Sequence, residues 1–301
     1  MPFIKLDLRE LYFAHGSVSR FHLYRILSQE LSRLSRSHKI RSWLEKIGGI
    51  KIGDFEVQLD WREKGASITD VLKSLDEWAS AQKGKLIIAI DEAQYLRLAG
   101  RVRYDGLIAW ATDNLDHLVF VLAGSEVGLL QDFLGLEDPS SPLYGRYAKI
   151  IKLQRLDRDR SLDFLERGFK EAGVEPPDLE EVVEVLNGLI GWLTLYGHTY
   201  VSEGKVELED FLKRAANLAE EESKRILRGS ERYWVVLKAV ASGATTWSQV
   251  YEWASLRLGP ISKSNLTYLL KSLSRYGYLE EKEEGFNIPD PVVRYLASHK
   301  K

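Results

Sequence analysis

The stretch that most constrains the fold is KLIIAIDEAQYLR, residues 85–97. Its five apolar residues, Leu86 to Ile90, run without alternation and end at Asp91 and Glu92. An unbroken apolar run of this length is typical of a strand that is buried on both faces of a parallel sheet. The two carboxylates would then stand at the carboxyl end of the strand, which is the edge where open α/β sheets place their ligands.

The two acids have two interpretations. In the first they form a Walker B motif, in which Asp91 holds a hydrated Mg²⁺ against nucleotide phosphates and Glu92 polarises an attacking water. In the second they only cap the exit of a buried strand. An apolar run followed by Asp-Glu arises often by chance, so the motif alone leaves both interpretations open.

Composition excludes several classes of protein. The 301 residues are 45% hydrophobic, hold no run of membrane-spanning length and do not begin with a signal-peptide pattern. We therefore expect a soluble, cytoplasmic protein of two or three domains with no membrane partner. The absence of cysteine rules out disulfides, thiol catalysis and zinc–thiolate sites. Scarce sulfur residues and 29% charged residues favour a thermophilic source.

Periodicity places helices and strands ahead of the central stretch. We expect a strand from Phe3, a helix after Ser17, and a half-exposed strand or hairpin over 55–61. Another helix is expected to begin at Ser67, because Ser67 and Asp70 have the spacing of a capping box. A helix that leads into a fully apolar strand is the order found in a parallel sheet.

A second buried strand is expected over 117–123, after a helix over 101–115. This strand ends close to Ser125, which could contact a γ-phosphate or its attacking water. Ser125 could also cap the helix that begins near Val127, since serine does so readily. The two roles are compatible.

Arg146 lies in a loop punctuated by proline and glycine, ahead of a strand expected over 148–153. An arginine there could act as a finger on a phosphate, either within one chain or across a subunit contact in a homo-oligomer. A surface ion pair is the alternative for a lone arginine.

Residues 229–301 form the clearest module. Helical patterns over 233–240, 247–254 and 262–276 precede a two-stranded wing that ends near Ile288. Three helices followed by a wing are typical of a winged helix-turn-helix.

The third helix of this module offers a candidate binding surface. Its leucines face the core, which leaves an outward set that could read a DNA groove or bind a protein partner: Ser264, Tyr268, Lys271 and Arg275. The module is mildly basic, but its wing carries four glutamates, which would repel a DNA backbone. DNA binding and protein binding therefore both remain open.

Five segments extend along the chain: DLRELYF from Asp7, LIIAIDEAQ from Leu86, VFVLAGSEVGLL from Val119, SPLYGR from Ser141 and GWLTLYG from Gly191. In this order they resemble the motifs of the archaeal AAA+-type ATPases of the STAND class. The resemblance implies an α/β fold with a parallel-sheet P-loop NTPase core over 1–155, an α-helical lid over 156–228 and a winged helix-turn-helix over 229–301.

The resemblance also implies ligands and roles. ATP would be the nucleotide and Mg²⁺ the cofactor, with Asp91 holding the ion through water. Glu92 would be the catalytic base, Ser125 a sensor and Arg146 a finger.

One feature of the family is missing. It places a P-loop, G-x-x-x-x-G-K-S/T, ahead of the DLRE strand, and these 301 residues contain no such pattern. We expect that the chain begins after the first strand and the P-loop, and that a version carrying them is an ATP-driven switch. A non-hydrolysing scaffold and a winged-helix DNA-binding regulator with a dimerising core are the alternatives.

Overall fold

The chain folds into two compact units, Met1–Ala148 and Lys149–Lys301, each with its own hydrophobic core. The computed structural model describes residues 2–15, 18–38, 40–45, 50–52, 57–59, 67–99, 102–125, 127–227 and 230–300. None of the helices described there is long and apolar enough to cross a membrane. A three-part division with boundaries at 155 and 228 stays a prediction.

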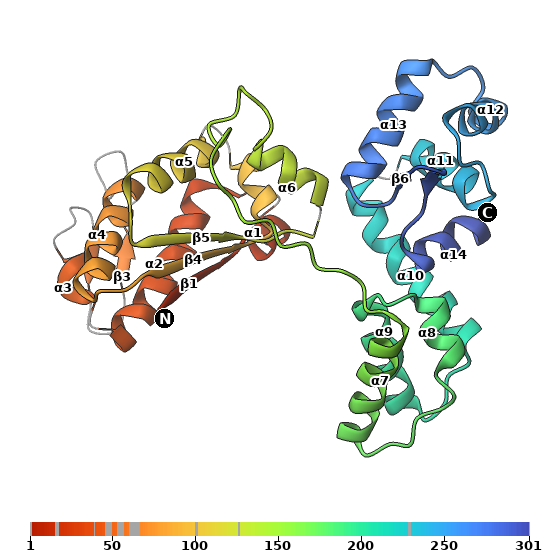
Figure 1. Cartoon of the computed structure of the whole chain (residues 1–301), viewed down its shortest axis with the longest axis horizontal. Coiled ribbons are helices and arrows are strands. Elements are labelled where there is room, and N and C mark those ends of the chain that lie inside the picture. Colours follow the sequence, from red (N-terminus) through yellow and green to blue (C-terminus); the bar gives the residue numbers. More distant parts are fainter. Residues whose placement is uncertain are drawn as a thin grey trace. The chain divides into compact units, whose positions relative to one another are not determined.

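A three-stranded parallel sheet organises the first unit (Figure 1). β4 (Leu86–Asp91) lies between β1 (Phe3–Asp7) and β5 (Leu118–Leu122) and runs parallel to both. The register pairs Asp7 with Asp91, so the carboxyl ends of β1 and β4 meet at one edge. The strands predicted from Phe3, over 86–90 and over 117–123 are therefore confirmed.

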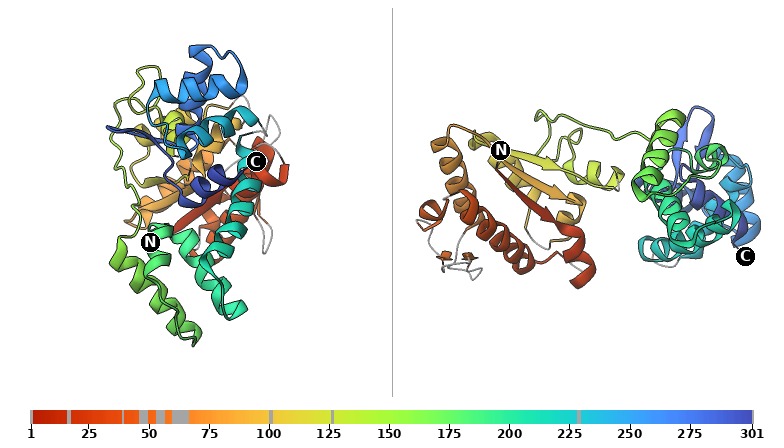
Figure 2. Two further views of the ribbon diagram at one scale, coloured as in Figure 1. Left: turned by 90° about the vertical axis from the view of Figure 1, so that its right-hand side faces the viewer. Right: turned by 90° about the horizontal axis from the view of Figure 1, so that it is seen from below.

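Helices supply the crossovers that parallel strands require. α2 (Arg20–His38) packs against β1, α4 (Ile68–Ala81) against β4 and β5, and α5 (Tyr104–Asn114) against β5. The right-hand view of Figure 2 shows α2 beside the strands. The leucines that predicted α2 all lie in the core: Leu23, Leu27, Leu31 and Leu34.

The remaining elements of the first unit are short. They are α1 (Leu8–His15), α3 (Arg41–Leu44), β2 (Ile50–Ile52), β3 (Val57–Leu59), the 3₁₀ helix η1 (Ala93–Leu98) and α6 (Val127–Leu134). β2 and β3 pair antiparallel. β3 confirms a strand within the predicted range 55–61, its hairpin partner β2 lies ahead of that range, and residues 55–56 and 60–61 are outside the described residues.

The strand predicted over 148–153 is wrong. These residues have no regular secondary structure, and Ile150, Ile151 and Leu153 are exposed. No described strand pairs with them, and an apolar segment without a neighbouring strand gains no ladder of hydrogen bonds.

The predicted capping box at the start of α4 is also wrong. Ser67 does occupy the N-cap position, but its hydroxyl contacts the Thr69 hydroxyl and caps no backbone N–H. The helix begins where the pattern predicts because its buried stripe, which includes Val71 and Trp78, packs into the core.

Helices make up the first half of the second unit. They are α7 (Arg158–Ala172), α8 (Glu180–Leu186), α9 (Ile190–Glu203) and α10 (Leu208–Ile226). The turn between α8 and α9 contains Gly188, whose φ is +70°. A Cβ at this position would lie 1.9 Å from the carbonyl oxygen of Leu156, so the turn accepts only glycine.

A winged helix forms the second half, as predicted. Its elements are α11 (Glu231–Ala241), α12 (Trp247–Leu258), α13 (Lys263–Arg275), β6 (Glu280–Lys282), β7 (Gly285–Asn287) and α14 (Pro291–His299). β6 and β7 are the antiparallel wing. Periodicity missed α14, although its start has a sequence signal: Asp290 accepts hydrogen bonds from the N–H groups of Val292 and Val293, and proline takes the first helical position.

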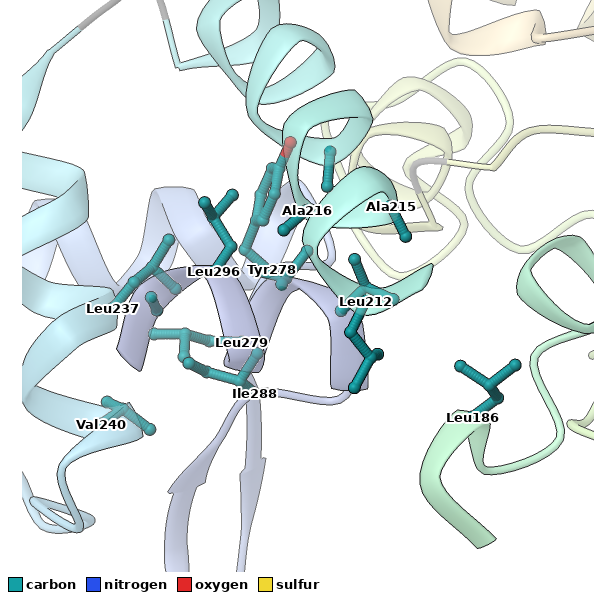
Figure 3. Packing of buried hydrophobic residues seen from close by; sticks show 14 of the residues in the cluster. Leu186, Leu212, Ala215, Ala216, Leu237, Val240, Tyr278, Leu279, Ile288 and Leu296 are labelled. Carbon is teal, nitrogen blue, oxygen red and sulfur yellow. The ribbon is translucent and has the colours of Figure 1, made fainter. Parts of the chain in front are cut away.

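One core joins the helical segment to the winged helix. Leu212 of α10, Leu237 of α11 and Leu296 of α14 belong to the same buried cluster (Figure 3). The indole N–H of Trp192 on α9 also donates to Asp290 at 2.9 Å. Both apolar and polar contacts therefore join the helical segment to the winged helix.

Candidate functional site

The carboxyl end of β4 carries the two candidate acids. Asp91 ends the strand with its side chain 40% exposed, and Nζ of Lys5 lies 3.7 Å from its carboxylate. Glu92 follows with φ 52° and ψ 46°. This left-handed conformation costs a residue with a Cβ about 1–2 kcal/mol. The Glu92 residue is only 2% exposed, so its side chain lies inside the unit.

The Glu92 carboxylate is fully hydrogen-bonded. Arg9 forms an ion pair with its Oε1. Ser125 donates its hydroxyl to Oε1 at 3.0 Å and its backbone N–H to Oε2 at 3.3 Å, while Nε2 of Gln94 lies 2.6 Å from Oε2. A carboxylate accepts about four hydrogen bonds, so these contacts occupy its acceptor positions.

The structure thus brings two of the predicted site residues, Glu92 and Ser125, into direct contact. It adds Arg9 and Gln94, which the sequence analysis did not single out. Arg9 lies two residues beyond β1, whose carboxyl end is beside that of β4. That position would have marked Arg9 as a candidate, but only once the strand order was known.

Gln94 is completely buried next to Gly124. A Cβ at Gly124 would lie 2.3 Å from Oε1 of Gln94, so the glycine leaves room for the amide. Within the described ranges this Oε1 has no hydrogen-bond partner. The Gln94 amide therefore donates its N–H to the Glu92 carboxylate, while its oxygen lies beside Gly124.

Arg146 makes other contacts. Its Nε donates to Asp113 of α5 at 2.9 Å, and its guanidinium also donates to the carbonyl of Pro142. The hydrogen-bonded guanidinium holds the pKa of Asp113 below its ordinary value. The structure therefore shows the ion pair that was the alternative for Arg146, and the finger role stays a prediction.

Mg²⁺ and ATP place different demands on this edge. Mg²⁺ usually keeps several waters and binds through one or two carboxylates together with substrate phosphates. Asp91 fits that role, since its carboxylate is a partly exposed hard oxygen donor; the described residues hold no cluster of three metal-binding side chains. The 301 residues supply no P-loop for the phosphates. The site fits the metal end of a nucleotide and does not by itself cradle the phosphates.

The second candidate surface lies on α13. Its predicted outward residues are all exposed, and the leucines between them are buried. The outward residues are Ser264, Tyr268, Lys271 and Arg275. The wing beside them is acidic: Glu281, Glu283 and Glu284 are exposed, and Glu280 pairs with Lys282 at 2.8 Å.

A parallel sheet with acids at the carboxyl end of its central strand, followed by helices and a winged helix, defines the class of protein. It is a P-loop NTPase-like fold of the AAA+ type. The solved ORC2 protein of Aeropyrum pernix, in ADPNP–ADP complexes, has the same fold: the TM-score is 0.50 at 16% identity, over 99% of this chain and 79% of that chain.

The chain belongs to a family of ATPases found mainly in Archaea. The model of that family, an ATPase domain predominantly from Archaea, matches residues 10–194. The model of the MCM protein C-terminal winged helix-turn-helix domain matches residues 228–288.

A solved relative supports this membership. The Walker-type ATPase PABY2304 of Pyrococcus abyssi is 34% identical, with a TM-score of 0.83 over 98% of this chain and 84% of that chain. A comparison with curated protein sequences finds no significant match.

Proposed function

We propose that this protein is an ATP-hydrolysing molecular switch whose hydrolytic site is the carboxyl end of β4. The observation that carries the proposal is Glu92, a buried carboxylate in a left-handed backbone conformation that contacts Ser125 of the neighbouring strand end. Backbone strain of this kind concentrates at functional sites. Membership of an archaeal ATPase family supports the same conclusion.

The residues at this edge divide the work. Asp91 would hold Mg²⁺ through water, and the bound ion would supply positive charge for the phosphoryl group. Glu92 orients and deprotonates the attacking water. Ser125 positions Glu92 and senses the γ-phosphate.

Arg9 gives the site a resting state. Because the acceptor positions of Glu92 are occupied, water reaches the carboxylate only after a donor leaves. Arg9 is the donor most able to leave, since its side chain is 56% exposed. Nucleotide phosphates compete for a guanidinium, so ATP binding draws Arg9 away and frees Glu92.

The phosphate cradle and the finger complete the proposal. Residues 1–301 contain no P-loop pattern. Among the described strands β5 lies at an edge of the sheet, so a P-loop strand from another segment would have room to pair with it. Arg146 would act as the finger after release from Asp113, within one chain or across a homo-oligomer contact.

The test is Glu92→Gln in a version of the chain that carries a P-loop ahead of β1. We expect ATP binding to persist while turnover falls by a factor of about 100 or more, because the amide holds no proton-accepting charge for the water. Glu137→Gln, at an exposed acid, is the matched control and should turn over at the parent rate.

Two results would contradict the proposal. Turnover by Glu92→Gln at the parent rate would remove Glu92 from catalysis. A stop codon directly before Met1, with no P-loop upstream, would favour the non-hydrolysing scaffold. Assignment to the STAND class, cytoplasmic location and a DNA or protein partner for the winged helix belong to the proposal as predictions.

A further inference from the structure

The winged helix contains a pocket that the ATPase proposal does not use. Its volume is about 410 Å³, and it opens between α13 and the start of α11. Five of its lining residues carry the argument: Arg232 and Tyr233 from α11, Asn265 and Tyr268 from α13, and Tyr276 directly after α13.

The walls of the pocket are aromatic with polar edges. Tyr268 is 63% exposed, so most of its ring is open to a ligand. Burial raises the pKa of Tyr233, whose hydroxyl is hydrogen-bonded with those of Ser272 and Tyr268. The hydroxyls of two tyrosines thus meet at the pocket, and flat ring surfaces stand beside them.

The α13 side of the pocket is positively charged. Residues 263–275 contain three cations, Lys263, Lys271 and Arg275, and no acid, while the start of α11 contributes Arg232 beside Glu231. Within the described part of the chain, no ion pair involves Arg232, Lys263 or Lys271. These cations are therefore available to an anionic ligand, which is the charge complement of this surface.

The chemistry favours one occupant. Cations that follow a backbone, together with aromatic rings that stack on bases, are how proteins bind single-stranded nucleic acid. The wing opposes a duplex, because Glu281, Glu283 and Glu284 are exposed where a winged helix would meet a second phosphate backbone. A single strand that contacts only α13 and α11 avoids that repulsion.

We propose that this pocket binds single-stranded nucleic acid. One base stacks on Tyr268 with its edge near Asn265, and the flanking phosphates pair with Arg232 and Lys271. The binding does not depend on ATP hydrolysis, so its failure would leave the ATPase proposal untouched.

The test is fluorescence anisotropy of a labelled oligothymidylate titrated with the whole chain at low salt. Tyr268→Ala should weaken binding by roughly 5-fold to 150-fold, the range for loss of one stacked base. Tyr268→Phe keeps the ring and should bind within about 2-fold of the parent. Lys271→Ala should weaken binding and reduce the salt slope by about 0.7, because one phosphate contact is lost.

Controls separate the pocket from general electrostatics. Lys213→Ala removes an exposed cation of α10 that does not line the pocket, and it should change neither affinity nor slope. Asn265→Asp adds a negative charge at the rim without opening a cavity and should also weaken binding. Circular dichroism checks that each variant is folded.

Three results would overturn the proposal. The first is no anisotropy change at low salt, which would leave the pocket to a protein partner. The second is an equal loss of oligonucleotide affinity in Tyr268→Ala and Tyr268→Phe. The third is a duplex of the same sequence that binds more tightly than the single strand.

Discussion

Glu92 shows how side-chain contacts hold a residue in an unfavourable backbone conformation. Its left-handed φ is stabilised because Arg9, Gln94 and Ser125 each donate to the same buried carboxylate. A buried acceptor that loses a donor pays part of its desolvation cost again. Each donor is therefore coupled to the geometry of the strand end.

Replacing Arg9 by alanine should lower the free energy of unfolding of the first unit by about 1–2 kcal/mol, because the buried Glu92 carboxylate loses its charged donor Arg9. The expected loss of stability is smaller than for a fully buried ion pair, since Arg9 is partly exposed. Urea denaturation followed by circular dichroism measures it. Arg97→Ala, at an exposed arginine of η1, is the control. Equal effects of the two substitutions would show that the Arg9–Glu92 pair contributes nothing.

At the scale of elements, the carboxyl end of β4 differs from the β5 edge of the sheet. The Glu92 carboxylate directly after β4 is hydrogen-bonded by neighbouring residues. β5 pairs only with β4 among the described strands and exposes Val119 and Val121. In the second unit the tight element is the turn between α8 and α9, where the backbone N–H of Leu156 donates to the carbonyl of Gly188 at 3.0 Å. Close backbone approach, more than side-chain packing, sets that turn.

Two glycine-to-alanine substitutions test this turn with the same added methyl group. Gly188→Ala should destabilise the second unit by about 3 kcal/mol or more, since it combines a positive φ with a Cβ in contact with backbone. Gly168 lies on the exposed face of α7, and a Cβ there would meet no atom within 4 Å. Gly168→Ala should therefore stabilise the second unit by about 0.5–1 kcal/mol. Thermal unfolding compares the two. A tolerated Gly188→Ala would mean that the turn has another conformation.

At the scale of the whole molecule, each unit has its own core, and the candidate sites are divided between them. The acids of the hydrolytic site belong to the first unit, and the tyrosine pocket belongs to the second. The first unit presents Asp91 and Lys5 at the sheet edge without a P-loop. Nucleotide affinity and nucleic-acid affinity should therefore respond to different substitutions.

Mg-ATP should bind residues 1–301 weakly, with no saturation in the micromolar range. Backbone amides, a lysine and a hydroxyl normally cradle the phosphates, and carboxylates alone present like charge to a polyanion. Isothermal titration calorimetry measures the affinity, and titration without Mg²⁺ is the control. Micromolar binding would show that another segment of these residues replaces the P-loop.

Local pattern was enough to predict much of this protein. The apolar run of β4, the leucines of α2 and α13, and the wing follow from the order of residues along the chain, because burial on one face or two leaves a local period. Asp91, Glu92 and Ser125 could be predicted as site residues because each lies at or shortly after the end of a strand that local periodicity identifies. The missing strand over 148–153 shows the limit, since a strand needs a partner that its own sequence does not contain.

The contacts of the candidate site depend on strand order. Arg9 and Glu92 are 83 residues apart, and they meet because β1 pairs with β4 in a register that aligns their carboxyl ends. Arg146 pairs with Asp113, 33 residues away, for a similar reason. Such pairs have no local period, because the geometry that joins them comes from the packing of separate elements, and folding alone shows which donors surround Glu92.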